Sequence, residues 1–196
     1  MNKKVMVVIG KACSGKDYYA ERMLDIDDKY IVKASDLVKK IIKRNVEIKN
    51  ESQLDNVNIY EHSSVELWEE IVQEFNKIVE ENDEEGLTFV LTGIRESKIL
   101  DELMKKYDDI GIILLNVTLD LRVKFYGISR NKENLSDVEI TKHLIFRDVK
   151  DNFIGLGELI QHIHNLESKY KKIVQYDYQY YTVFNDTLEI NFYEKI

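Results

Sequence analysis

This sequence predicts an α/β protein in which helices cover both faces of a largely parallel sheet. Short apolar runs alternate along the chain with stretches whose apolar residues recur every three or four positions. The chain has 196 residues, 44% of them hydrophobic, which is enough for a single domain spanning residues 1–196 with its own core. Strand–helix alternation implies this architecture, and ligands then bind beyond the carboxyl ends of the strands.

In the first half of the chain, the period of the apolar residues separates strands from helices. Continuous apolar runs are typical of strands buried on both faces, and a spacing of three or four is typical of amphipathic helices. The clearest helix covers residues 64–81, and we interpret its Glu-rich face as solvated surface. Polar residues 45–62 predict a connection or an insertion. The predicted strands are 5–9, 30–32 (weak) and 87–91, and the predicted helices are 17–24, 35–42 (with a Ser or Asp N-cap) and 64–81.

The second half continues the same alternation and ends in an aromatic strand. Gly155 and Gly157 interrupt one helical stretch. Residues 127–137 are polar and predict a mobile connection, and residues 176–184 alternate aromatic with polar side chains as a late strand does. The remaining predicted elements are a strand at 110–116 and helices at 98–107, 119–126, 138–149 and 158–170.

Composition excludes several classes of protein. A single Cys allows no disulfide framework or multi-Cys zinc site within the chain, and the absence of Pro excludes collagen-like and polyproline structures. The N-terminal apolar run of residues 5–9 is too short for a membrane span or a signal peptide, so we expect a soluble, cytoplasmic protein without a membrane partner. A net charge of −8 argues against broad nucleic-acid binding. The four histidines form no metal-binding pattern.

The most informative segment is Gly10-Lys-Ala-Cys-Ser-Gly-Lys-Asp17, which fits G-x-x-x-x-G-K. It directly follows the first buried strand and opens a helix, as a phosphate-binding loop must. Gly10 and Gly15 allow tight turns, so that the backbone of Gly10, Lys11, Ala12, Cys13, Ser14 and Gly15 presents its N–H groups to the phosphates of ATP. Lys16 is predicted to neutralise charge that develops during phosphoryl transfer.

Asp17 stands where Ser or Thr is usual in this motif. A carboxylate beside a triphosphate is repulsive unless a divalent ion lies between them, so we expect Asp17 to bind Mg²⁺ directly or through water. The alternative is an Asp in the first helical turn that the helix dipole favours. Cys13 is interpreted as a small loop residue, with a thiol activated by Lys11 and Lys16 as the alternative.

The string GKACSGKDYYA resembles the start of small P-loop kinases that carry G-K-D, namely phage-type deoxynucleoside monophosphate kinases and animal-type phosphomevalonate kinases. Both belong to the nucleoside monophosphate kinase-like group, which includes archaeal dephospho-CoA kinase-like proteins. Three further regions resemble family segments in the same order: residues 33–41 near the acceptor, 148–158 after the lid, and 177–188 at the closing strand and turn. Leu91-Thr-Gly-Ile-Arg95 resembles the strand-end segment, with Thr92 or Gly93 in place of the metal-binding Asp.

The resemblance implies a three-layer P-loop NTPase fold with a five-stranded parallel sheet, an acceptor arm within residues 36–75 and a lid at about 122–147. The lid would exclude water and bring in cations. Arg130 is the first candidate and Arg147 the second, chosen from Arg122, Lys124, Arg130, Lys132 and Arg147. The alternative for each is ordinary surface basicity.

Three residues outside the loop and the lid are candidate ligands of substrate. Arg95, just past a buried strand, is predicted to hold the acceptor phosphate, or else to form a structural ion pair. Asp36 binds the acceptor, assists Mg²⁺, or caps the following helix. Asn185 either borders the nucleotide base or turns the chain.

These residues predict an enzyme that transfers the γ-phosphoryl group of ATP, with Mg²⁺, to a small phosphorylated acceptor that is a (deoxy)nucleoside monophosphate. A second hypothesis keeps the fold and changes the acceptor to dephospho-CoA, phosphomevalonate or another metabolite. A third is a nucleotide-binding module that has lost transfer, which Asp17 and the missing Asp at Thr92 or Gly93 favour.

Overall fold

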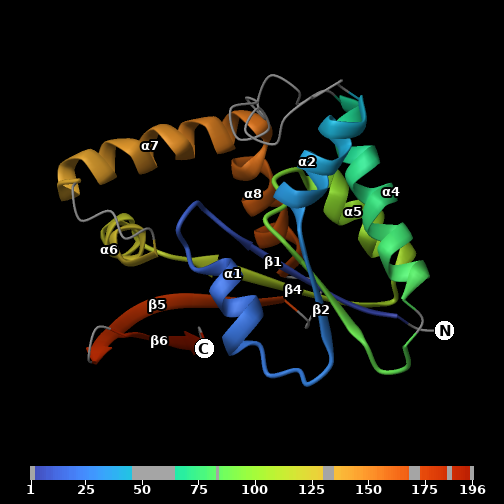
Figure 1. Cartoon of the computed structure of the whole chain (residues 1–196), viewed down its shortest axis with the longest axis horizontal. Helices are drawn as coiled ribbons and strands as arrows, with labels where there is room; N and C mark the ends of the chain where they lie inside the picture. The colour runs from blue at the N-terminus through green and yellow to red at the C-terminus, as the bar shows by residue number, and fades with distance from the viewer. Residues whose placement is uncertain are drawn as a thin grey trace.

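The computed structural model describes residues 3–45, 65–82, 84–129, 135–167, 173–184 and 187–194, with strands β5 and β6 described by their backbone. Figure 1 shows the whole chain. The elements in chain order are β1 (Lys4–Gly10), α1 (Lys16–Tyr18), the π-helix η1 (Tyr19–Met23), β2 (Lys29–Lys33), α2 (Ala34–Asn45), α4 (Val65–Glu81), β3 (Thr88–Thr92), α5 (Ser97–Lys106), β4 (Asp109–Asn116), α6 (Leu119–Ser129), α7 (Asp137–Ile154), α8 (Leu156–Glu167), β5 (Ile173–Phe184) and β6 (Thr187–Glu194).

The strands form one sheet in the order β2-β3-β1-β4-β5-β6. Strands β2, β3, β1 and β4 are parallel, and they form the part of the sheet whose side chains are described. Val7 of β1 pairs with Leu91 on one side and with Ile112 on the other. β5 adds parallel to β4, and β6 then pairs antiparallel with β5. The sheet therefore has six strands rather than the predicted five, because the chain turns back after β5 and adds β6.

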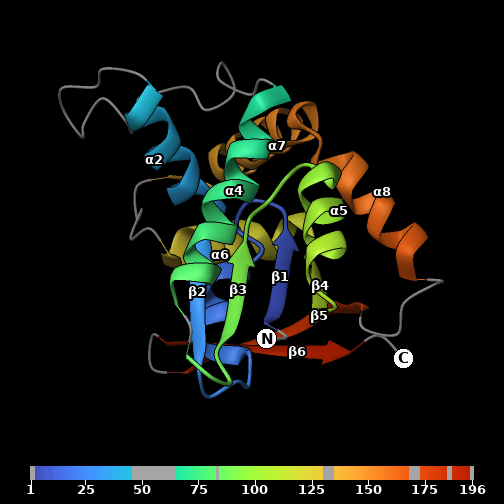
Figure 2. The same cartoon turned by 90° about the vertical axis from the view of Figure 1, so that its right-hand side faces the viewer.

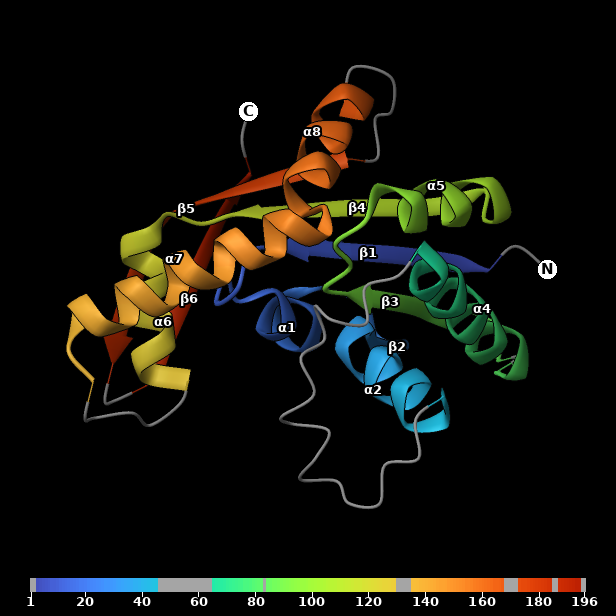
Figure 3. The same cartoon turned by 90° about the horizontal axis from the view of Figure 1, so that it is seen from above.

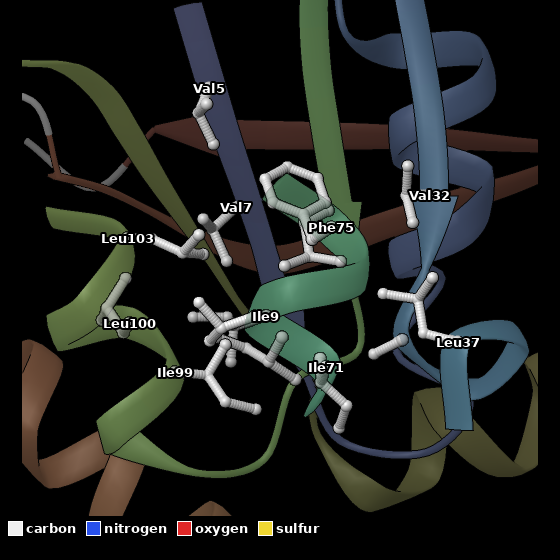
Figure 4. Packing of buried hydrophobic residues seen from close by; sticks show 14 of the residues in the cluster. Val5, Val7, Ile9, Val32, Leu37, Ile71, Phe75, Ile99, Leu100 and Leu103 are labelled. Atoms are coloured by element: carbon white, nitrogen blue, oxygen red, sulfur yellow. The ribbon is translucent and has the colours of Figure 1, made fainter. Parts of the chain in front are cut away.

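Helices cover both faces of the parallel strands, which confirms the α/β prediction. Figure 2 shows α2, α4, α5 and α8 on one side of the strands, and Figure 3 shows β2, β3, β1 and β4 side by side beneath them. The larger core lies on this side, where Val5, Val7 and Ile9 of β1 face α4 and α5 (Figure 4). The alternate residue Val8 faces a smaller cluster that includes Tyr19, Ala20 and Phe125, from η1 and α6. Alternation along one strand thus supplies two cores.

The predicted helix 17–24 forms as two short pieces rather than one regular helix. α1 gives way at Tyr19 to a π-turn, in which the Leu24 N–H donates to the Tyr19 carbonyl at 2.9 Å. Wider turns of this kind occur often at functional sites. The distortion lies one turn after the phosphate loop.

Helix α7 is longer than predicted and begins with a capping box. The Ser136 side chain accepts from the Glu139 N–H, and the Glu139 carboxylate accepts from the Ser136 N–H. The helix ends at Gly155, whose φ of 127° is unfavourable for other residues. The predicted interruption at Gly155 is confirmed, whereas Gly157 lies inside α8.

The sequence predicted that the acidic face of α4 is solvated surface, and this is wrong for Glu74, which is buried. Glu74 is 7% exposed and lies 2.6 Å from Lys40 Nζ and 2.6 Å from Arg44 Nη1, both on α2. Arg44 Nη2 also donates to Glu70 at 2.6 Å. The face therefore joins α4 to α2. Both helices lie partly within the predicted acceptor arm, of which residues 46–64 are outside the described residues.

In the part of the chain that the structure describes, each helix is too short or too polar to cross a bilayer.

Candidate functional site: a phosphate loop and two clefts

The predicted phosphate loop forms at the carboxyl end of β1. Strand β1 ends at Gly10, the loop follows, and α1 begins at Lys16. Gly15 has a φ of 78°, in the left-handed region that glycine adopts most easily, and Cys13 has a φ of 59°. The Ser14 N–H donates to the Lys11 carbonyl at 3.1 Å, which closes a tight turn. This strand–loop–helix unit has the backbone arrangement that phosphate-binding loops use, so phosphate binding here stays a prediction.

Gly10 is required for its small size rather than for an unusual backbone angle. A Cβ at this position would lie 2.4 Å from Ser14 Oγ and 3.2 Å from the Leu115 carbonyl oxygen. Ser14 is fully buried, and its hydroxyl has no hydrogen-bond partner among the described residues. The loop therefore folds back tightly over its own beginning, as a compact cradle for an anion must.

Lys16 passes directly over Gly93, at the end of β3. A Cβ on Gly93 would lie 3.2 Å from Lys16 Cε, and Gly93 itself has a φ of 78°. The Gly93 N–H donates to the Val8 carbonyl at 3.2 Å, which fixes this crossing point against β1. The Lys16 side chain is 19% exposed, and its Nζ lies 3.6 Å from Asp17 Oδ2. The lysine is therefore held near the loop with its charge accessible.

Asp17 is bound to the end of the neighbouring strand. The Thr92 hydroxyl donates to Asp17 Oδ1 at 2.9 Å. Thr92 is 1% exposed, whereas the Asp17 side chain is 44% exposed. This contact brings together the loop carboxylate and the strand-end position that the resemblance pointed to.

Arg122, one of the five cations from which the lid candidates were chosen, is buried and contacts the phosphate loop. It is 2% exposed and donates through Nη1 and Nη2 to the two oxygens of Asp148, at 2.8 and 2.6 Å. Nη1 also donates to the Ala12 carbonyl at 3.1 Å. Lys11 Nζ lies 3.8 Å from Asp148 Oδ2. The guanidinium thus ties α6 and α7 to the phosphate loop.

A cleft of about 320 Å³ opens beside the loop. The sequence predicted several of its lining residues, but not the aromatic wall from α6 or His143 from α7. Phe125 and Tyr126 are buried, and the Tyr126 ring lies 5.4 Å from the His143 ring. The lining residues are Ala12, Cys13, Gly15, Lys16, Asp17, Tyr18, Arg95, Phe125, Tyr126, His143, Leu144 and Arg147.

Arg95 and Arg147 both contact one buried carboxylate, that of Asp151, which the sequence did not predict as a site residue. Asp151 is 1% exposed; Arg95 Nε donates to its Oδ1 at 2.8 Å, and Arg147 Nε lies 3.4 Å from the same oxygen. Arg95 Nη1 also donates to the Gly93 carbonyl at 3.2 Å. The ion pair considered for Arg95 is therefore present. It does not remove Arg95 from the cleft, because both arginines line it.

The two arginines also line a second, smaller cavity of about 60 Å³ between α2, α4 and the end of β3. Its walls are mostly apolar, with Val38, Leu67 and Ile71 among them. Glu96 contributes a carboxyl group, and burial raises the pKa of that carboxyl while Lys98 partly opposes the rise. The arginines thus stand between a cleft beside the phosphate loop and an apolar cavity.

The other predicted site residues are not brought into these clefts by the described structure. α2 begins at Ala34, so Asp36 lies inside its first turn and the predicted capping role is wrong. Asp36 is exposed and lines neither cavity. Arg130 and Asn185 lie outside the described residues, as does Lys132. The roles assigned to these residues stay predictions. Cys13 lines the larger cleft as a half-buried thiol.

The donor set of the loop fits magnesium bound together with phosphates. Among the described residues no group of three or more His, Cys, Asp or Glu side chains could hold a metal alone. Magnesium in nucleotide sites needs only one or two protein oxygens, because phosphates and water complete its shell. Asp17 and Thr92 supply a carboxylate and a hydroxyl next to the loop. We therefore retain ATP and Mg²⁺ as the ligands to be tested.

Comparison with solved structures finds similar chains at low sequence identity. TT1252 from Thermus thermophilus has a TM-score of 0.50 at 13% identity, covering 89% of each chain. Shikimate kinase from Bacteroides thetaiotaomicron has a TM-score of 0.45 at 15% identity, covering 88% of this chain and 85% of that one. The tunicamycin resistance protein from Deinococcus radiodurans has a TM-score of 0.47 at 8% identity, covering 88% and 86%. No protein-family model and no curated protein matches the chain. The likeness to TT1252 supports the α/β fold and carries no activity with it.

Proposed function

We propose that this chain is a phosphotransferase that moves the γ-phosphoryl group of ATP to a small phosphorylated acceptor, a (deoxy)nucleoside monophosphate. One observation carries the proposal: the phosphate loop and the Arg95–Arg147 pair line the same cleft. A loop that binds a polyphosphate and two cations that face it provide the two halves of a phosphoryl-transfer site.

The loop and Lys16 bind the donor. Backbone N–H groups of residues 10–16 surround the phosphates, and the start of α1 adds positive potential. Lys16, held over Gly93, places its ammonium where charge accumulates on the transferred group. Magnesium, when bound at Asp17, supplies further neutralisation of the phosphate oxygens.

Arg95 and Arg147 bind the acceptor phosphate. Each guanidinium is planar and matches two phosphate oxygens at once. The Asp151 carboxylate contacts the Nε atoms of Arg95 and Arg147, at 2.8 and 3.4 Å, and so restricts both side chains before phosphate binds. This lowers the conformational entropy that the arginines lose on binding. The mostly apolar cavity beyond the arginines is the place for the remainder of the acceptor.

The reaction needs no covalent intermediate. An oxygen of the acceptor phosphate attacks the γ-phosphorus in line, a new P–O bond forms, and the bond to the β-phosphate oxygen breaks to release ADP. The acceptor oxygen is already anionic near neutral pH, so it needs no strong base. Positioning and charge neutralisation therefore provide the rate enhancement.

The test is ADP release in the presence of Mg²⁺ and a panel of acceptors: deoxynucleoside and ribonucleoside monophosphates, dephospho-CoA and phosphomevalonate. We expect a monophosphate to stimulate ADP release and Lys16→Ala to lower turnover by about 10²–10³-fold without unfolding the protein. Lys105→Ala, at an exposed lysine of α5, is the matched control and should behave as wild type.

Each other result has a definite meaning. Stimulation by dephospho-CoA or phosphomevalonate alone would change the acceptor and keep the reaction. Tight binding of Mg-ATP with no ADP release for any acceptor would reject the transferase in favour of a nucleotide-binding module. A Lys16→Ala variant as fast as wild type would reject the loop as the donor site.

A further inference from the structure

Two chemical groups that P-loop NTPases commonly use for magnesium are present here at exchanged positions. In the common arrangement, the residue after the loop lysine supplies a hydroxyl, and a strand-end residue supplies a carboxylate. In this chain the residue after Lys16 is Asp17, and the last residue of β3 is Thr92. Their side chains meet at 2.9 Å, so the hydroxyl and the carboxylate still form one pair.

Of the two strand-end positions, 92 and 93, the backbone lets only position 92 take part in this exchange of hydroxyl and carboxylate. Thr92 pairs with Val8 at the last step of the β1–β3 ladder, and its side chain points to α1. Gly93 has a φ of 78°, and a Cβ there would crowd Lys16 at 3.2 Å. A carboxylate at position 93 would strain the backbone and displace the lysine. The sequence left Thr92 and Gly93 as alternatives, and the geometry selects Thr92.

The two oxygens of Asp17 have different surroundings. Oδ1 accepts the hydrogen bond from Thr92, whereas Oδ2 lies 3.6 Å from Lys16 Nζ. The hydroxyl therefore fixes the rotation of the carboxylate and leaves Oδ2 beside the lysine that faces the phosphates. Thr92 is 1% exposed, so its hydroxyl is shielded from water, whereas the Asp17 side chain is 44% exposed and remains accessible.

We propose that Asp17 and Thr92 form a magnesium site with exchanged roles, in which Asp17 Oδ2 is the anionic ligand of Mg²⁺-ATP and Thr92 is the positioning residue that orients it. The inference rests on the proposed ATP binding and goes beyond it, because it assigns the chemistry of the metal site to two named atoms. A purely structural link between α1 and β3 is the competing explanation for the hydrogen bond.

The two explanations differ in the sign of one effect. Without a divalent ion, the charge of Asp17 repels ATP; with Mg²⁺, the same charge holds the complex. Asp17→Asn keeps the shape of the side chain and removes the charge. We expect this variant to bind a non-hydrolysable ATP analogue several-fold more tightly than wild type in EDTA and about tenfold more weakly in Mg²⁺. A structural link would change both affinities in the same direction.

Variants at Thr92 test the positioning role. Thr92→Val removes the hydroxyl at nearly constant shape, and Thr92→Ser retains it. We expect Thr92→Val to lose about threefold or more of the affinity gained on adding Mg²⁺, and Thr92→Ser to retain it. The double variant Asp17→Ser with Thr92→Asp restores the common arrangement, so it should recover Mg²⁺-dependent binding that Asp17→Ser alone loses.

Calorimetric titration of the analogue with and without Mg²⁺, and Mn²⁺ electron paramagnetic resonance of the complex, provide the readouts. If wild type binds no analogue in either condition, the proposed function fails. If wild type binds the analogue and Asp17→Asn gains as much affinity on adding Mg²⁺ as wild type does, the exchanged-role inference fails while the proposed function stands. A change of the Mn²⁺ spectrum in Asp17→Asn, together with opposite shifts in the two affinities, supports it.

Discussion

The Arg122 guanidinium binds the Asp148 carboxylate through two parallel hydrogen bonds of 2.8 and 2.6 Å. The same guanidinium donates to the Ala12 carbonyl, 110 positions away in the sequence. Fork-to-fork contacts of this kind fix orientation as well as distance. The phosphate loop is therefore tied to α6 and α7 by one buried side chain, and a shift of those helices would move the loop backbone.

Removing one partner of this pair should cost both stability and nucleotide affinity. Asp148→Asn leaves a buried guanidinium without its anion, and we expect the free energy of unfolding to fall by about 3 kcal/mol. Under the proposed function, the affinity for Mg-ATP should fall as well, because Ala12 belongs to the loop that would bind the phosphates. Urea denaturation and calorimetric titration measure the two effects.

The double variant Arg122→Met with Asp148→Leu separates the effect of the contact between Arg122 and Ala12 from the cost of leaving a buried charge unpaired. Because it leaves no unpaired charge, it should be more stable than Asp148→Asn, while the loop still lacks its contact at Ala12. A loss below about 1 kcal/mol in Asp148→Asn would mean that the pair behaves as an exposed ion pair.

Gly93→Ala should impair the site more than its cost to stability explains. The left-handed φ of 78° makes any Cβ unfavourable by about 1–2 kcal/mol, and this Cβ would also press on Lys16 Cε. Gly86 offers a matched control, since its φ is 84° and a Cβ there would meet nothing within 4 Å. Both variants should lose similar stability in urea. Only Gly93→Ala should also lose ATP affinity, and equal affinities in the two variants would contradict the placement of Lys16.

The contact between α2 and α4 should depend on pH through Glu74. Its hydrogen bond from Lys40, followed by that from Arg44, lowers the pKa of the Glu74 carboxyl below its usual value. A lowered pKa in the folded state gives stability that is present above pH about 4.5 and is lost as the pH falls through the folded value. Glu74→Gln should therefore lose about 1 kcal/mol at pH 7, because both cationic partners are more than half exposed.

The same comparison at low pH provides the check. The difference in stability between wild type and Glu74→Gln should shrink as the pH falls below the unfolded pKa and then through the lowered folded pKa of Glu74, where wild type becomes protonated as well. Glu81→Gln is the control, because its pairing with Lys77 is 62% exposed on both sides and should contribute little at either pH. A difference that stays constant from pH 7 to pH 3 would show that Glu74 acts by packing alone.

The sequence was sufficient to predict the helices and strands that depend on a local pattern of apolar residues. The apolar runs 5–9, 87–91 and 110–116 all form parallel strands, because burial on both faces requires such runs. Strand β6 was not predicted, although residues 187–194 alternate polar with apolar. The aromatic run before it predicts a late strand at residues 176–184, but which strand lies at the edge of a sheet depends on pairing rather than on local pattern.

The site was predictable where a motif fixes the backbone and not where distant side chains meet. Spacing alone identified Gly15, Lys16 and Asp17 in the loop. It did not distinguish Arg122, which is buried, from the exposed Lys124 on the same helix. Asp148 and Asp151 lie three apart on α7 and receive arginines from two other segments. An acidic pair at that spacing next to Arg147 was the available signal, but only the tertiary fold shows its partners.

Arg95 and Arg147 should affect the acceptor and leave the donor unchanged. Under the proposed function, Arg95→Gln and Arg147→Gln each remove a guanidinium from the acceptor side of the cleft, while the phosphate loop is untouched. We expect the KM for the monophosphate acceptor to rise by about tenfold or more in each variant, since a charged hydrogen bond contributes about 1.5–3 kcal/mol. The affinity for Mg-ATP should change by less than about twofold.

Asp151→Asn shows whether the shared carboxylate positions these arginines. Under the proposed function, the buried Asp151 would act on the acceptor only through the two arginines, so its loss should raise the same KM with a smaller effect than either arginine variant. Lys142→Gln, at an exposed lysine of α7 that lines neither cleft, controls for the loss of a positive charge on that helix. If the arginine variants weakened ATP binding and left the acceptor KM unchanged, the cations would belong to the donor side, and the acceptor would have to lie elsewhere.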